Sequence, residues 1–190
     1  MFVVSSGFIG KFKIGDNVNY NLAVLAQLYD HFGRGLEDKQ KLLCKPITIL
    51  LISIIEAFLY DLHFRGRTFT SEGVANVARS WFEALRGSNV DEFARLIDRA
   101  KNHKLLGDVG DEFYSSLHEL RKLRNRVHIQ NEKNDLDVDD VLAFTPARKV
   151  AAEEALEKVA KYLAAHYPRP EHVQGHVADF KLPWREHYRL

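Results

Sequence analysis

Residues 46–62 are apolar at almost every position. A helix that is apolar on all sides must be covered, and the cover is other helices of the chain, a second copy of it, or lipid. A membrane-spanning helix needs about 20 mainly apolar residues. This segment is shorter and contains Glu56 and Asp61. We therefore expect it to form the centre of a helix bundle or the seam of a dimer, with no membrane contact.

Apolar residues recur every three or four positions along most of the remaining chain, which is the period of an α-helix. This pattern predicts helices at residues 18–32, 37 or 46 to 64, 74–85, 91–106, 111–130 and 146–166. No run of strands is visible in the sequence after its N-terminal segment. The pattern therefore predicts an all-α fold, a compact antiparallel helix bundle of four to six helices.

The two ends of the chain lack a strong helical period. Residues 1–17 alternate weakly between apolar and polar, so we expect a short β-hairpin or an arm there. Pro168 and Pro170 end the last helix. The predicted organisation is an N-terminal arm at residues 1–17, one helical domain at 18–166 and a C-terminal tail at 167–190.

Charge and cysteine content limit the classes of function. The chain has 27 Lys and Arg residues against 26 Asp and Glu residues, a formal net charge of +1. This balance excludes a protein that coats nucleic acid by charge alone, so a basic site must be local. The single cysteine, Cys44, excludes a disulfide framework and a zinc cluster of thiolates. The N-terminus has no basic segment before an apolar run, and we expect a cytoplasmic protein.

The predicted helix at residues 111–130 has two distinct faces. At about 100° per residue, Leu120, Leu123 and Val127 form an apolar stripe about 60° wide. Five polar side chains share the neighbouring sector, which is about 120° wide. They are His118, Arg121, Arg124, Asn125 and His128. Residues three, four and seven apart stack on a helix, so these groups can act on one ligand.

These side chains suit the cleavage of RNA by attack of the 2′-hydroxyl on the neighbouring phosphate. A His titrates near neutral pH and can accept or donate a proton. An adjacent Arg can hold the phosphate and stabilise the charge that grows on its oxygens. An Asn can orient either group by hydrogen bonding. The stripe contains no carboxylate cluster of the kind that holds Mg²⁺, so we expect no metal and no cofactor.

A simpler interpretation is a solvated basic surface. Four basic residues fall at positions 121–126, and an acidic loop follows at 131–140. The basic residues would then pair with the loop and have a structural role only. The same stripe could also bind RNA, a nucleotide or an acidic partner without catalysis.

Residues 124–128 have the order Arg-Asn-Arg-Val-His, late in a predicted helix, and this motif resembles that of the HEPN superfamily. The signature of that family is an Arg, often followed by Asn, and a His after a gap of four to six residues. Three residues separate Arg124 from His128 and six separate Arg121 from it, so either arginine is a candidate for the motif Arg. An apolar helix with an internal acid, Glu56, precedes the motif, and a closing helix follows it, as in the family.

The resemblance covers residues 18–166 and carries expectations about function. HEPN domains are helical bundles that usually dimerise, and their two motif helices then form one composite cleft. Many are metal-independent endoribonucleases of toxin–antitoxin and phage-defence systems, whereas others are adaptors without activity. We therefore expect a homodimer that cleaves RNA as a toxin or defence effector, or alternatively a non-catalytic adaptor that binds RNA, a nucleotide or a partner protein.

The resemblance implies that His128 transfers the proton, that Arg124 or Arg121 contacts the scissile phosphate, and that Asn125 positions one of these groups. Glu56 would orient an arginine. The expected catalytic residues are Arg124, His128, Asn125 and Arg121, and the expected supporting residues are Glu56 and His118.

One position departs from part of the family. Members that an antitoxin silences by nucleotide transfer have a Tyr two residues after the motif His, and here that position is Gln130. A nucleotidyltransferase-like antitoxin would therefore act by binding. Two further candidates are set aside. His172 and His176 lie between helix breakers, so we expect no zinc site there, and Cys44 is expected in the core.

Overall fold

A computed structural model of the chain describes residues 1–68, 79–85, 92–127 and 139–188. Its elements are β1 (Phe2–Val4), α1 (Phe12–Arg34), α2 (Glu37–Thr68), α3 (Arg79–Leu85), α4 (Phe93–Asn102), α5 (Asp111–Asn125), α6 (Asp140–Ala143), α7 (Pro146–His166), the 3₁₀ turn η1 (Glu171–Val173) and β2 (Phe180–Leu182). The predicted all-α helix bundle is confirmed, because the described strands form only one two-stranded sheet.

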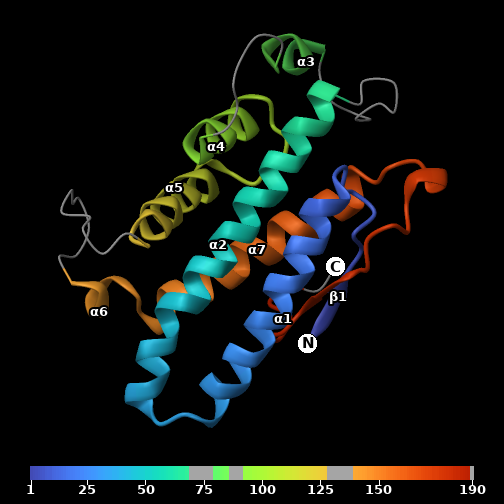
Figure 1. Cartoon of the computed structure of the whole chain (residues 1–190). Helices are drawn as coiled ribbons and strands as arrows, with labels where there is room; N and C mark the ends of the chain where they lie inside the picture. The colour runs from blue at the N-terminus through green and yellow to red at the C-terminus, as the bar shows by residue number, and fades with distance from the viewer. Residues whose placement is uncertain (69–78, 86–91, 128–138, 189–190) are drawn as a thin grey trace.

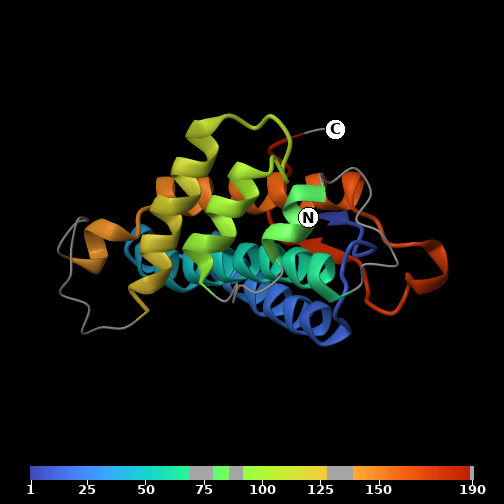
Figure 2. The ribbon, with the colours of Figure 1, turned by 90° about the horizontal axis from the view of Figure 1, so that it is seen from above.

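Helix α2 forms the centre of the bundle. It contacts each of the other described α-helices, and its largest interface is with α7. Figure 1 shows α2 running through the middle of the molecule, with α1 on one side and α4 and α5 on the other. Seen from above, α4 and α5 lie next to each other across α2 (Figure 2). The apolar segment at residues 46–62 is therefore covered by the chain's own helices.

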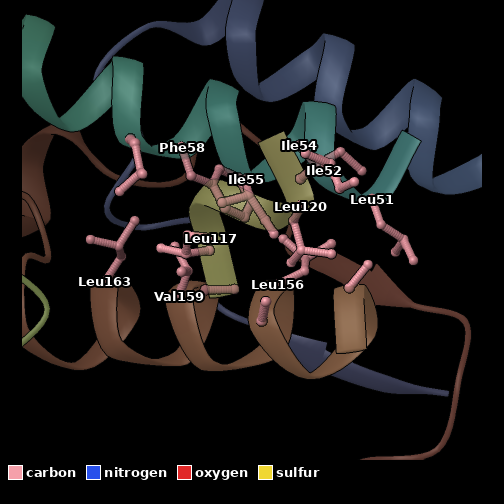
Figure 3. Packing of buried hydrophobic residues seen from close by; sticks show 14 of the residues in the cluster. Leu51, Ile52, Ile54, Ile55, Phe58, Leu117, Leu120, Leu156, Val159 and Leu163 are labelled. Carbon is pink, nitrogen blue, oxygen red and sulfur yellow. The ribbon is translucent and has the colours of Figure 1, made fainter. Parts of the chain in front are cut away.

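The core is built mainly from α2 side chains that interlock with α5 and α7. Close to the middle of α2, its apolar side chains point toward Leu117 and Leu120 of α5 and toward Leu156 and Val159 of α7 (Figure 3). All of these side chains are at most 4% exposed. At about 25 cal/mol per Å² of buried apolar surface, such a contact set is the main source of stability for the bundle.

Among the described helices, α2 alone is long and apolar enough to cross a membrane by length and composition. Half of its most apolar stretch is buried inside the bundle. The helix begins at Glu37, so Pro46 lies inside it rather than at its first turn. Because proline has no N–H, the backbone hydrogen bond that residue 46 would donate to residue 42 is missing.

The two ends of the chain, for which the sequence predicts an N-terminal arm and a C-terminal tail, pair with each other. β1 runs antiparallel to β2, with Phe2 opposite Leu182 and Val4 opposite Phe180. Both Leu182 and Phe180 are 0% exposed. The segment at 167–190 was expected to be a tail because its local pattern is polar and rich in helix breakers. Its few apolar residues instead reach the core through pairing with a strand about 180 positions away.

Helix boundaries agree with the sequence where a local signal marks them. α7 begins at Pro146, and the side chain of Thr145 accepts a hydrogen bond from the Arg148 amide at 3.2 Å. The predicted helix at 146–166 is thus confirmed at both ends. α1 begins at Phe12, six residues earlier than predicted, because a long-range contact described below holds its entry.

Two helices, α4 and α5, are shorter than the apolar pattern indicated, whereas α2 extends to Thr68, beyond its predicted end at residue 64. α4 covers Phe93–Asn102 of the predicted 91–106. α3 covers only the end of the predicted helix at 74–85, whose first residues lie outside the described residues. α5 ends at Asn125 rather than near residue 130. α6 is a single turn that the periodicity did not indicate.

Candidate functional site

Helix α5 places its predicted apolar stripe in the core. Leu120 and Leu123 are at most 4% exposed, as predicted. Val127 is 49% exposed, because the helix ends two residues before it and the chain turns at Arg126. The prediction that Val127 belongs to the apolar stripe is therefore wrong, since it assumed a continuous helix to residue 130.

Arg124 forms the strongest link between the stripe and the rest of the bundle. Its Nη2 lies 2.9 Å from Oε2 of Glu56 on α2, and the two side chains are 38% and 20% exposed. Burial raises the pKa of the Glu56 carboxyl, and the charge and hydrogen bond of Arg124 oppose that shift. The pair joins Glu56 to Arg124, one of the two arginines that the resemblance left as candidates, and it leaves the guanidinium partly open to solvent.

Arg121 lies one turn before Arg124 and is partly buried. Its Nε is buried and has no hydrogen-bond partner. A buried N–H without a partner costs about 1–3 kcal/mol. Arg121 makes no ion pair with any carboxylate in the described part of the chain, so its charge is available to a ligand with negative charge.

The other two described stripe residues lie toward α4 and toward the end of α5. His118 Nε2 lies 3.1 Å from Oδ1 of Asp98 on α4, and the imidazole is 28% exposed. This contact turns His118 toward α4. Asn125 is exposed and is the last residue of α5. His118 and Asn125 are seven positions apart, about 10 Å along the helix axis, so a ligand that contacts both must span about two helical turns.

His128, the expected proton-transfer residue, lies outside the described residues, and so does Gln130. The angle predicted for His128 depended on a helix that continues to residue 130. On α5 itself, His118, Arg121, Arg124 and Asn125 have the predicted helical relationship.

Ion pairs at this end of the molecule include one partner, Lys45, that the sequence analysis did not identify. Arg126, which follows α5, is 6% exposed, and its Nε lies 3.2 Å from Oδ1 of Asp140. Asp140 also pairs with Lys45 of α2. The interpretation that the basic residues at 121–126 pair with the acidic loop at 131–140 is met by Arg126 and Asp140, and residues 131–138 of that loop lie outside the described residues. Nothing in the local pattern could identify Lys45, which is 95 positions away.

No group of three or more His, Cys, Asp and Glu side chains is placed to hold a metal ion within residues 1–68, 79–85, 92–127 and 139–188. His172 belongs to η1, and His176 packs its ring against Phe12. Cys44 is fully buried, and burial raises the pKa of its thiol, so it is a core residue.

Comparison of the chain with models of known families, with curated proteins and with solved structures finds no match.

Proposed function

We propose that this chain is a metal-independent endoribonuclease of the HEPN type, which acts as a homodimer and serves as a toxin or phage-defence effector. The observation that carries the proposal is the Arg124–Glu56 ion pair between α5 and α2. It holds a partly exposed guanidinium four positions before His128 in the sequence. Arg121 and Asn125 lie on the same helix within one turn of Arg124.

In the proposed reaction, His128 accepts the proton of the ribose 2′-hydroxyl. The 2′-oxygen then attacks the neighbouring phosphorus, and the bond from phosphorus to the 5′-oxygen of the next nucleotide breaks. The imidazolium of His128, directly or through a water molecule, then delivers its proton to that leaving oxygen. The products are a 2′,3′-cyclic phosphate and a free 5′-hydroxyl.

The arginines have the electrostatic part in this scheme. A guanidinium that contacts the scissile phosphate stabilises the charge that grows on its oxygens in the transition state. Glu56 is the positioning residue for Arg124, because an ion pair to a second helix restricts the arginine to one orientation. Arg121, whose buried Nε has no hydrogen-bond partner, supplies a second positive charge one turn away.

The proposal is tested by incubating the purified full-length chain with RNA in the presence of EDTA. We expect cleavage products that end in 2′,3′-cyclic phosphate. His128→Ala should lower the rate about 10²- to 10⁴-fold, the usual contribution of a general acid or base. His172→Ala is the matched control, since His172 is an exposed histidine on η1 and should leave the rate unchanged.

Equal rates for the wild type and His128→Ala would contradict the proposal. RNA binding without any cleavage would favour the second candidate, a non-catalytic adaptor, which the unpaired Arg121 also supports. In that case binding should weaken with salt, and Arg121→Ala should lower the slope of log K against log salt by about one. For the nuclease, the resemblance implies a nucleotidyltransferase-like antitoxin as partner.

A further inference from the structure

Three charged side chains from separate parts of the chain meet at the end of α5. Arg126 directly follows the helix, Asp140 is the first residue of α6, and Lys45 belongs to α2. Oδ1 of Asp140 accepts a hydrogen bond from Nε of Arg126 at 3.2 Å, and Oδ2 accepts one from Nζ of Lys45. Asp140 thus bridges two cations, one on α2 and the other directly after α5.

The bridge is anchored in the bundle. Arg126 is 6% exposed, and removing a carboxylate that pairs with a buried cation is destabilising. The hydrogen bond from Lys45 lowers the pKa of Asp140, which keeps the carboxylate charged. Lys45 also lies over the ring of Phe144, with Nζ 5.6 Å from the ring centroid, so its own position is restricted.

The bridge lies next to the candidate site. Arg126 follows Asn125 and is two positions after Arg124. Lys45 and Glu56 are eleven positions apart, about three helical turns, so they lie on nearly the same face of α2. α2 therefore holds the end of α5 at two points, once through Glu56 and once through Lys45 and Asp140. The last turn of a helix has free carbonyl groups and frays without such a contact.

We propose that Asp140 is a positioning residue of the site: it fixes the last turn of α5 and thereby sets where Arg124 and Asn125 lie. This inference rests on the proposed function for its catalytic consequence. Asp140 does not touch substrate in this scheme. It acts through Arg126, and its removal should shift the two stripe residues that precede Arg126 in the chain.

The test compares Asp140→Ala with Asp139→Ala in the full chain. Asp139 is the neighbouring exposed acid, and its side chain makes no capping hydrogen bond to α6. A misplacement of about 1 Å can cost about 10²-fold in rate. We expect Asp140→Ala to lower kcat for RNA cleavage about 10- to 100-fold with a smaller change in KM. Asp140→Glu should recover most of the loss, and Asp139→Ala should match the wild type.

Hydrogen exchange of the α5 amides is measured on the same proteins. Asp140→Ala should speed exchange in the last turn, residues 122–125, by about tenfold or more, with the first turn unchanged. Asp140→Asn retains the side-chain volume and serves if the alanine variant does not fold. The proposal would be overturned if Asp140→Ala or Asp140→Asn exchanged the amides of the last turn at the wild-type rate. It would also be overturned if either variant had the kcat of the wild type.

Failure of the proposed function gives a different pattern. If the wild-type chain does not cleave RNA, the nuclease proposal falls, and the exchange rates alone decide whether Asp140 fixes the end of α5. If the wild type cleaves and His128→Ala is inactive while Asp140→Ala and Asp140→Asn behave as the wild type, the nuclease proposal stands and the role proposed for Asp140 is wrong.

Discussion

Glu56 and Asp61 are the two acids inside the apolar segment, and they face different neighbours because five residues turn a helix by about 140°. Glu56 faces α5 and pairs with Arg124. Asp61 is fully buried and accepts hydrogen bonds from the backbone N–H groups of Gly10 and Lys11, at 2.7 and 2.9 Å. The contact holds the chain at the point where α1 begins, which explains why that helix starts earlier than its apolar pattern indicates.

Asp61→Ala should destabilise the protein by about 2–4 kcal/mol, because the buried N–H of Gly10 loses its acceptor at a cost of about 1–3 kcal/mol and the partly buried N–H of Lys11 loses its acceptor at a smaller cost. The free energy of unfolding in urea measures the effect. Asp16→Ala, an exposed acid on α1, is the control and should stay within about 0.5 kcal/mol of the wild type. A loss below about 1 kcal/mol for Asp61→Ala would mean that water replaces the carboxylate at this point.

At the scale of elements, the sequence was accurate for α7 and inaccurate for the end of α5, and the reason is local. Thr145 and Pro146 are strong start signals, and Pro168 stops the chain soon after His166. Residues 126–130 contain neither glycine nor proline, so the sequence pattern predicts a continuing helix where the chain turns at Arg126. The pair of Arg126 with Asp140 forms directly after this helix end, and a tertiary contact of that kind leaves no mark in the local pattern.

The strand pair of the two termini gives the element-scale prediction. Phe180→Ala should destabilise the protein by about 3–5 kcal/mol, the usual cost of emptying a buried aromatic site. Phe180 is 0% exposed and contacts the rings of Phe8 and Phe58, whose centroids lie 5.8 and 5.2 Å from its own. Thermal and urea unfolding measure the loss.

Lys181→Ala is the matched control for that experiment. Lys181 is exposed on the same strand, and its substitution should change stability by no more than about 0.5 kcal/mol. Similar small effects for both variants would show that the segment after α7 behaves as the dispensable tail that its composition indicated.

At the scale of the whole molecule, the apolar segment turned out to be the axis of the bundle. The sequence left open whether other helices or a second copy would cover it, and the structure covers it with α1, α4, α5 and α7. Several large apolar side chains of α1, α2 and the turn between them remain exposed, namely Tyr20, Leu36 and Leu42. The structure describes a single copy of the chain, and the homodimer stays a prediction that follows from the resemblance and from the composite cleft it implies.

Sedimentation of the full chain at micromolar concentration tests this prediction. We expect a species of about twice the 21.9 kDa chain mass, because a composite cleft needs two copies. RNA cleavage should then fall more steeply than in proportion to protein concentration once the dimer dissociates on dilution. A chain that sediments only as a monomer while it cleaves RNA would show that one copy contains the complete site.

Local pattern was sufficient for the fold class, for most of the helices and for the polar stripe on α5, because helical period, caps and proline positions depend on neighbours within about four residues. The structure alone decided which partner each polar group meets. Arg124 with Glu56, Asp61 with the start of α1, Asp140 with Lys45, and β1 with β2 all join positions far apart in the chain. Such contacts follow from how the helices pack around α2, and the packing is set by the whole apolar core rather than by any single stretch of sequence.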